Sequence, residues 1–158
     1  MILLDTHALL WYLMGSPLLP EEVRERIKNE PVVFVSSASV WEIGIKVRLG
    51  KMRVDGRAIE SREKVEAIVR ACEAEEFQFL SIGVEASLMA AFQGGNHRDP
   101  FDRMLAAQSL FPQKLTIVSA DPVFDEMSSE IQRYWPGTSL FLSNSKKTIP
   151  GSRWKTKR

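Results

Sequence analysis

Short apolar segments that alternate with helical patterns constrain the fold of this chain more than any other feature. Four segments rich in Leu, Ile, Val and Phe have the length of buried strands, and they begin at Met1, Val32, Phe77 and Leu115. Segments with apolar residues at helical spacing separate them. Strands buried on both faces that alternate with helices are typical of a parallel sheet covered by helices on both sides. The sequence therefore predicts an α/β fold with three layers, α/β/α, and a central, mainly parallel sheet of four to five strands.

Several helix boundaries are marked by residues that start or stop helices. Pro20, followed by two glutamates, predicts a helix with proline in its first position that runs to about Asn29. The segment SASVWEIGIKVRLGK predicts a helix that ends near Gly50. Residues 60–76 predict a helix with a strongly charged outer face.

The pattern weakens after Asp121. The segment SSEIQRYWPGTSLF reads poorly as a strand, and no element is predicted beyond Gly137. Residues 143–158 hold six Lys and Arg and no acid, which leaves 15 of the 21 Lys and Arg against all 20 Asp and Glu, a net charge of −5 for the rest of the chain. We therefore expect a single domain over residues 1–137 and a basic, flexible tail over residues 138–158. Such a tail either contacts nucleic acid or is a solvated end.

Composition places the chain among ordinary globular proteins. Its 158 residues suit one domain, and 44% hydrophobic and 26% charged residues are typical of soluble proteins. The single Cys72 excludes an internal disulfide and a thiolate metal cluster, and it fits a reducing compartment. No apolar run approaches the roughly 20 residues that span a bilayer. The apolar start lacks a basic segment and contains Asp5 and His7, which argues against a secretory signal. We expect a cytoplasmic protein.

Four carboxylates occupy positions where a parallel sheet collects functional groups. Asp5 ends the first apolar strand, Glu42 lies in the helix after the second, and Asp121 ends the last. Asp102 lies in the first turn of the helix predicted for NHRDPFDRMLAAQSL. Because the carboxyl ends of parallel strands meet at one edge, we expect these acids to converge there. Converging carboxylates repel one another unless a cation neutralises them, and oxygen ligands select a hard cation, Mg²⁺ or Mn²⁺.

Each of these acids also has a structural interpretation. Glu42 follows Ser39 at the spacing of a capping box, and it precedes Lys46 at the spacing of a surface ion pair. Asp121 precedes a proline, as turn residues do, and Asp5 is placed to cap the first helix. Spacing alone leaves both interpretations open.

Two aspartates stand three residues apart in the NHRDPFDRMLAAQSL segment. Asp99 precedes Pro100, which is the arrangement of a helix N-cap followed by proline in the first turn, and an acid at Asp102 suits the positive end of the helix dipole. Neither His7 nor His97 is predicted to be a metal ligand, because a lone histidine near a helix start is more often a packed or capping side chain.

Four motifs, in order along residues 1–125, resemble those of PIN-domain proteins. They are MILLDTHALLW, SSASVWEIGIKVRLGK, HRDPFDRMLAAQSL and LTIVSADPVF. The chain is most similar to the VapC-like toxins of bacterial type II toxin–antitoxin pairs. This resemblance implies a small α/β/α PIN domain that cleaves RNA with Mg²⁺ or Mn²⁺.

The resemblance assigns roles to individual residues. The catalytic, metal-binding acids of the family fall on Asp5, Glu42, Asp102 and Asp121. The implied reaction is hydrolysis of a phosphodiester bond, with the metal ion lowering the pKa of the attacking water and stabilising the leaving 3′-oxygen. Thr6 and Asp99 are expected to contact a ligand or a bound water, although for Asp99 the N-cap is the main role. Lys46 and Arg48 either contact RNA phosphates or are solvated charges.

The resemblance also implies partners. A VapB-like antitoxin, a small DNA-binding protein, would cover the acidic pocket, and the toxin would form a homodimer. The apolar segment LLWYLMGSPLLP is either a docking surface for that antitoxin or part of the core. The alternative function is a non-catalytic PIN-fold module that binds RNA or protein through its tail. The chain departs from the family pattern at Gly94 and Gly95, and again at its C-terminal end.

Overall fold

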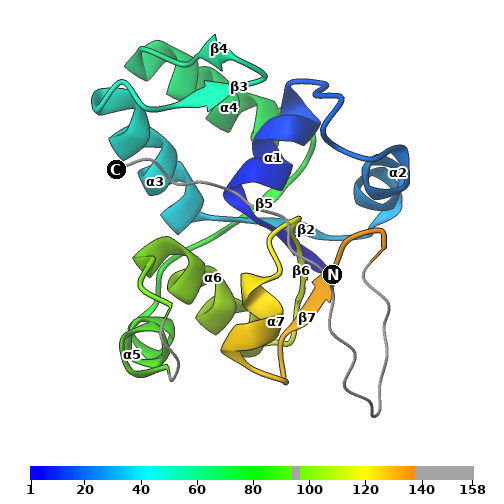
Figure 1. The fold of residues 1–158 in the computed structure, drawn as a ribbon, viewed down its shortest axis with the longest axis vertical. Coiled ribbons are helices and arrows are strands. Elements are labelled where there is room, and N and C mark those ends of the chain that lie inside the picture. Colours follow the sequence, from blue (N-terminus) through cyan, green and yellow to red (C-terminus); the bar gives the residue numbers. More distant parts are fainter. Residues whose placement is uncertain (94–96, 138–158) are drawn as a thin grey trace, which may run out of the picture.

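The computed structural model describes residues 1–93 and 97–137, so that Gly94, Gly95 and the whole predicted tail lie outside the described residues. A sheet in the order β5-β2-β1-β6-β7 runs through the middle of the molecule (Figure 1). All its pairings are parallel. The strands are β1 (Ile2–Leu4), β2 (Val33–Ser36), β5 (Gln78–Leu80), β6 (Thr116–Val118) and β7 (Gln132–Tyr134). The predicted parallel sheet of four to five strands is confirmed.

Helices cover both faces of this sheet, as Figure 1 shows. One layer consists of α1 (Thr6–Leu13), α2 (Glu21–Asn29), α3 (Ser37–Arg48) and α4 (Arg62–Ala74). The other consists of α5 (Val84–Phe92), α6 (Pro100–Leu110) and α7 (Val123–Met127), with α5 packed against α6. Pro20 occupies the N-cap position of α2, immediately before its first residue and one place earlier than predicted. The three-layer α/β/α architecture is therefore confirmed.

The strands feed two separate cores because successive side chains of a strand point to opposite faces. In β1, Ile2 and Leu4 pack with Leu9 and Ile43 in the layer of α1 to α4. Leu3 lies between them and packs instead with Leu105 of α6 on the other face. The short, fully apolar strands recognised in the sequence are thus buried on both sides.

The segment after Asp121 corrects the sequence analysis, because residues that read poorly as a strand form β7, paired in parallel with β6. The central residue of β7 is Arg133, whose buried guanidinium bonds both carboxylate oxygens of Asp125 in α7. It also donates to the carbonyl of Ser119, with 3.0 Å between Nη1 and the oxygen. A paired arginine fills the place where the apolar pattern requires an aliphatic residue.

A short hairpin was also absent from the sequence analysis. Strands β3 (Arg53–Val54) and β4 (Arg57–Ala58) are antiparallel and joined by Asp55 and Gly56, whose φ angles are 49° and 75°. Positive φ at both positions is the geometry of the type I′ turn that Asp-Gly favours.

The apolar segment of residues 9–20 belongs mostly to the core. Leu9, Leu10, Tyr12 and Leu19 are buried in the core beneath α1 to α4, whereas Leu18 is exposed. The core interpretation of this segment is therefore the better one. Among the helices of the described residues, none is long and apolar enough to cross a membrane.

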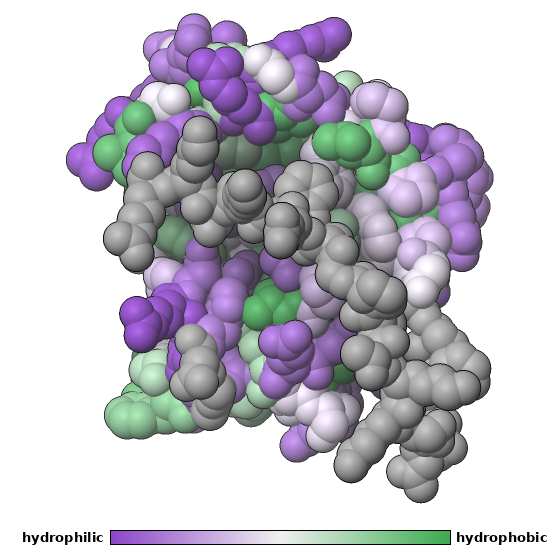
Figure 2. Space-filling view, in the orientation of Figure 1, coloured by the Kyte–Doolittle hydropathy of each residue, from purple (hydrophilic) through white to green (hydrophobic). Residues whose placement is uncertain are grey.

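One helix keeps an apolar face in solvent. Val84, Leu88 and Phe92 of α5 follow one another at intervals of four residues, and they are 75%, 50% and 85% exposed. We call these three residues the α5 stripe. Figure 2 shows hydrophobic side chains at the lower left, where Figure 1 places α5.

Candidate active site

Asp5 lies where β1 ends and α1 begins. Its Oδ1 accepts a hydrogen bond from the amide of Ala8 at 2.6 Å, which caps α1. Its Oδ2 accepts from the hydroxyl of Ser119. Burial raises the pKa of Asp5 above its ordinary value, the bonds from Ser119 and Ala8 and the charge of His7 lower it, and the charge of Asp121 raises it further. The capping interpretation of Asp5 is confirmed, and the same carboxylate lies at the carboxyl edge of the sheet.

Asp121 is positioned by the turn that follows β6. Its amide donates to the Ser119 hydroxyl at 3.0 Å, and its Oδ1 accepts from the amide of Val123 at 2.9 Å. One serine hydroxyl therefore contacts both acids, by donating to Asp5 and accepting from the main chain of Asp121. Ser119 was not identified from the sequence, although a serine two residues before another turn residue is a recognised turn signal.

Asp99 and Asp102 have different surroundings in the first turn of α6. Asp99 is the N-cap, and its Oδ1 accepts from the amides of Phe101 at 2.8 Å and Asp102 at 3.4 Å. Asp102 instead contacts His97, with 2.8 Å between Oδ2 of Asp102 and Nε2 of His97. The pKa of Asp102 rises to about 6, because burial and the charges of Asp99 and Asp121 outweigh the bond and charge of His97. The N-cap prediction for Asp99 is confirmed.

Glu42 reaches the same edge from α3. Its Oε2 accepts from the hydroxyl of Thr6 at 2.6 Å, and its Oε1 pairs with Lys46 at 2.5 Å. The predicted pair with Lys46 is present, but the capping box is wrong because Ser36, not Ser39, caps α3. Glu42 is buried, so the lysine supplies the charge that such a carboxylate needs. Arg48, two residues after Lys46, is exposed.

The fold brings three of the four predicted acids into electrostatic contact. The charge of Asp121 raises the pKa of both Asp5 and Asp102, so Asp121 lies within electrostatic range of each of them. Glu42 joins them through Thr6, the residue after Asp5. As these side chains lie, no three His, Cys, Asp or Glu residues in the described part of the chain form a group able to bind one metal ion.

The residues nevertheless fit a divalent cation by their chemistry. Every predicted ligand is a carboxylate, the donor that Mg²⁺ and Mn²⁺ prefer. Burial and the charge of Asp121 already raise the pKa of Asp5 and Asp102, and a cation would relieve both effects. Asp102 would exchange its contact with His97 for one with the ion.

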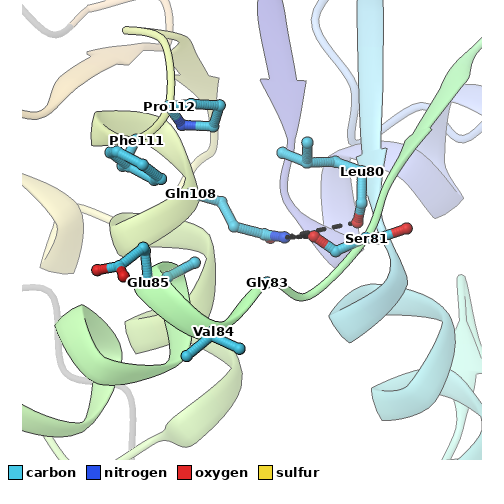
Figure 3. A pocket seen from close by; sticks show the side chains of 9 residues that line it. Leu80, Ser81, Gly83, Val84, Glu85, Gln108, Phe111 and Pro112 are labelled. Carbon is cyan, nitrogen blue, oxygen red and sulfur yellow. Dashed lines mark hydrogen bonds between the residues drawn. The ribbon is translucent and has the colours of Figure 1, made fainter.

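Two further side chains of α6 position this site, and neither was identified from the sequence. Gln108 accepts from the Ser36 hydroxyl at 2.6 Å and donates to the carbonyl of Ser81 at 3.1 Å, so it ties α6 to the start of α3 and the end of β5. Figure 3 shows Gln108 reaching toward Leu80 and Ser81 beside a pocket of about 360 Å³. A glutamine within the apolar run LAAQSL was the available signal, since a buried amide needs partners.

Arg103 ties α6 to the end of α5 and to the segment that contains His97. Its guanidinium donates to the carbonyls of Ala90 at 2.7 Å, Gln93 at 2.5 Å and His97 at 3.1 Å, and it also bonds that of Ala91. The arginine therefore satisfies the last carbonyls of α5 and fixes His97 beside Asp102.

Solved structures with a similar fold come from protein complexes bound to DNA. VapBC2 from Rickettsia felis bound to a promoter DNA fragment matches with a TM-score of 0.62 and 12% identity, over 85% of this chain and 98% of that one. DNA-bound VapBC from Salmonella typhimurium matches with a TM-score of 0.59 and 19% identity, over 85% and 98%. FitAB bound to an IR36 DNA fragment matches with a TM-score of 0.54 and 19% identity, over 85% and 94%. These likenesses establish a shared fold.

A search of curated protein sequences finds no match to this chain. A family model, in contrast, matches most of it: the model of the PIN domain covers residues 2–130, which include all four acids. The sheet order, the acids at its carboxyl edge and this match lead to one conclusion. The chain belongs to the PIN-domain family.

Proposed function

We propose that this protein is a Mg²⁺- or Mn²⁺-dependent endoribonuclease that hydrolyses RNA phosphodiester bonds. One observation carries the proposal. Asp5 and Asp102, from distant parts of a PIN domain, both lie close enough to Asp121 for its charge to raise their pKa. Mutual repulsion of this kind is costly in an apo site and useful in a site that binds a cation.

In this proposal Asp5, Glu42, Asp102 and Asp121 hold the ion. When bound, the ion supplies the positive charge that lowers the pKa of an attacking water and stabilises the leaving oxygen. Ser119 Oγ fixes Asp5 and the turn of Asp121, and Thr6 Oγ1 fixes Glu42. Asp99 holds the first turn of α6, and so the backbone of Asp102, in place.

Two basic residues of α3 are the proposed RNA contacts near the acids. Arg48 is exposed and able to meet a phosphate, and Lys46 lies against Glu42 at the site itself. Phosphate contacts of this type add affinity that falls with salt concentration. The basic residues 143–158 add six further charges for RNA, although they lie outside the described residues.

We further propose that the protein is the toxin of a type II toxin–antitoxin pair and acts in the cytoplasm. Its partner is a VapB-like antitoxin that places a basic side chain among the acids and thereby replaces the cation. The three solved structures with the same fold support this proposal, since two are VapBC complexes and one is a FitAB complex, each bound to DNA. Two copies of the chain pair as a homodimer.

The test compares the purified protein with its Asp5→Asn variant on structured RNA, in Mn²⁺ and in EDTA. Asparagine keeps the cap on α1 but removes the charge. We expect cleavage by the wild type in Mn²⁺ only, and a loss of at least about 100-fold in Asp5→Asn, the scale of removing one electrostatic catalytic group. In addition, Mn²⁺ should raise the Tm of the wild type and leave that of Asp5→Asn unchanged.

The matched control is Glu60→Gln, which removes an exposed acid outside the site and should keep full activity. Cleavage that persists in EDTA, or in Asp5→Asn, would contradict the mechanism. RNA binding without any cleavage, lost on removal of residues 143–158, would favour the non-catalytic binding module instead.

A further inference from the structure

Arg133 occupies a position in the sheet where an apolar side chain would be expected. It is the central residue of β7, opposite Ile117 of β6, and its side chain is 1% exposed. Its Nε and Nη2 atoms bond the carboxylate of Asp125 at 3.0 Å and 2.5 Å. Replacing a buried ion pair by well-packed apolar side chains of similar size is often neutral or even stabilising. Stability alone therefore does not account for an arginine at this position.

A further contact of Arg133 leads to the acids. Its Nη1 donates to the backbone carbonyl of Ser119 at 3.0 Å, and the next residue of β7, Tyr134, accepts from the Ser119 amide at 3.3 Å. Two consecutive residues of β7 therefore hold both backbone groups of Ser119, the residue that follows β6. Figure 1 shows β7 beside β6, with α7 next to β7.

Ser119 transmits this constraint to Asp5 and Asp121. Its hydroxyl donates to Oδ2 of Asp5 and accepts from the amide of Asp121 at 3.0 Å. The backbone and one side-chain torsion set the direction of a serine hydroxyl, so a shift of the Ser119 backbone would move the hydroxyl away from both partners. Burial raises the pKa of Asp5, and the bond from Ser119 opposes this by favouring the charged carboxylate, the form that binds a cation.

The ion-pair partner of Arg133 belongs to the same segment of the chain as Asp121. Oδ1 of Asp121 accepts from the amide of Val123, the first residue of α7, and Asp125 follows in that helix. One guanidinium thus holds the segment of residues 119–125 at both of its ends. Ser119 therefore cannot shift without breaking a buried, charge-assisted contact.

We propose that Arg133 is a positioning residue of the acidic site, which holds Ser119 in place and, through its hydroxyl, Asp5 and Asp121 for a divalent cation. This inference rests on the proposed cation-dependent function and adds to its site a residue from the strand that the sequence did not predict. A guanidinium suits the task, because its hydrogen bonds have fixed directions whereas apolar contacts have none. Replacing residues that support metal ligands typically weakens metal binding by about 10- to 100-fold.

The test measures the affinity for Mn²⁺ by titration calorimetry, at a temperature where each variant is fully folded. Arg133→Met should bind Mn²⁺ at least about 10-fold more weakly than the wild type. Ile27→Ala, which truncates a buried side chain of α2, is the matched control: it should lower the Tm and leave the affinity unchanged. Asp125→Asn keeps an acceptor for the guanidinium, so it should give a smaller loss in the same direction and serves as the test if Arg133→Met does not fold.

A double-mutant cycle tests whether Arg133 acts through Ser119. Ser119→Ala removes the hydroxyl and should weaken Mn²⁺ binding at least as much as Arg133→Met does. Arg133→Met in the Ser119→Ala background should then cost less than about two-fold, because the group that it positions is already absent. Affinity that is unchanged in Arg133→Met, or losses that multiply in the double variant, would overturn the inference.

The two proposals fail separately. If the wild type binds Mn²⁺ and cleaves RNA, and Arg133→Met binds Mn²⁺ equally well, the positioning role is wrong and the ribonuclease stands. If Mn²⁺ binding weakens in Arg133→Met but the wild type cleaves no RNA, the positioning role stands and the ribonuclease is wrong. A wild type that binds no Mn²⁺ contradicts both.

Discussion

Asp99 and Asp102 illustrate how one helical turn separates a structural carboxylate from a candidate ligand. Asp99 faces the free amides at the start of α6 and accepts two hydrogen bonds from them. Asp102 is already inside the helix, where it caps nothing and meets His97 and the charge of Asp121 instead. Its pKa of about 6 is the mark of a carboxylate held where its charge is unfavourable.

This raised pKa predicts how Asp102 affects stability. The folded protein binds the Asp102 proton more tightly than the unfolded chain, where the pKa is near 3.8. The free energy of unfolding should therefore fall as the pH rises from about 4 to about 6. This penalty for ionising Asp102 in the folded protein is complete above about pH 6. Asp102→Asn removes it, and should raise the free energy of unfolding at pH 8 by up to about 3 kcal/mol in EDTA. Urea unfolding at pH 4 and pH 8 measures the difference.

A cation should reduce the stability advantage of the Asp102→Asn variant. Mg²⁺ or Mn²⁺ should stabilise the wild type at pH 8 and have little effect on Asp102→Asn, so the difference between their free energies of unfolding becomes smaller. Glu60→Gln is the matched control, because it removes an exposed acid that does not act on Asp102, and it is expected to leave the pH dependence in place. A stability gain in Asp102→Asn that is equal at pH 4 and pH 8 would contradict the assignment.

At the scale of elements, the sequence predicted what depends on apolar pattern and helix caps. Strands such as Ile2–Leu4 and Val33–Ser36 are wholly buried, so their composition alone identifies them. The N-cap at Asp99 could also be predicted, because it depends only on Asp99 and the proline that follows it. In the site, Asp5, Asp102 and Asp121 could be placed at one edge from topology alone.

What could not be predicted depends on long-range polar partners. β7 was missed because its central Arg133 is buried only by virtue of Asp125 and the carbonyl of Ser119. The contact of Ser119 with Asp5 joins residues that are 114 positions apart in the sequence, which no local pattern encodes. The site roles of the four acids stay predictions, since they depend on a cation.

The ion pair of Arg133 and Asp125 helps to hold β7 in place, and we expect removal of its two partners to destabilise the protein by different amounts. The guanidinium is 1% exposed and the carboxylate 49% exposed. Asp125→Ala leaves a buried charge without its partner and should cost about 3–5 kcal/mol. Arg133→Met leaves a carboxylate that water can solvate, and it should cost clearly less, although the bond to Ser119 is lost.

Urea unfolding of the two single variants and the double variant measures this asymmetry. The double variant should be more stable than Asp125→Ala alone, because it no longer buries an unpaired charge. Glu126→Ala, a neighbouring acid of α7 that is exposed, serves as the control and should change stability by less than about 0.5 kcal/mol. Equal costs for the two single variants would mean that the guanidinium is not the buried partner.

Over the whole molecule, the acids depend on the contact between the two helical layers at one edge of the sheet. Asp5 and Glu42 belong to the layer of α1 to α4, and Asp102 to the layer of α5 to α7. Gln108 connects these layers through Ser36, the residue that caps α3, so α3 and α6 are held at a fixed distance. The geometry of the site is therefore a property of the whole domain.

The same two-layer organisation leaves the α5 stripe uncovered, and this predicts how two copies of the chain pair. Apolar side chains four residues apart form one continuous face, and a two-fold axis would place the stripes of two chains against each other. Light scattering should give twice the chain mass of 17.9 kDa for the wild type. Leu88→Glu, which puts a charge at the centre of the stripe, should give the monomer mass with an unchanged Tm at low concentration. Leu49→Glu puts a charge at the similarly exposed leucine that follows α3 as its C-cap, and this variant should remain a dimer. A monomeric wild type, or a dimer that survives Leu88→Glu, would rule out pairing through α5.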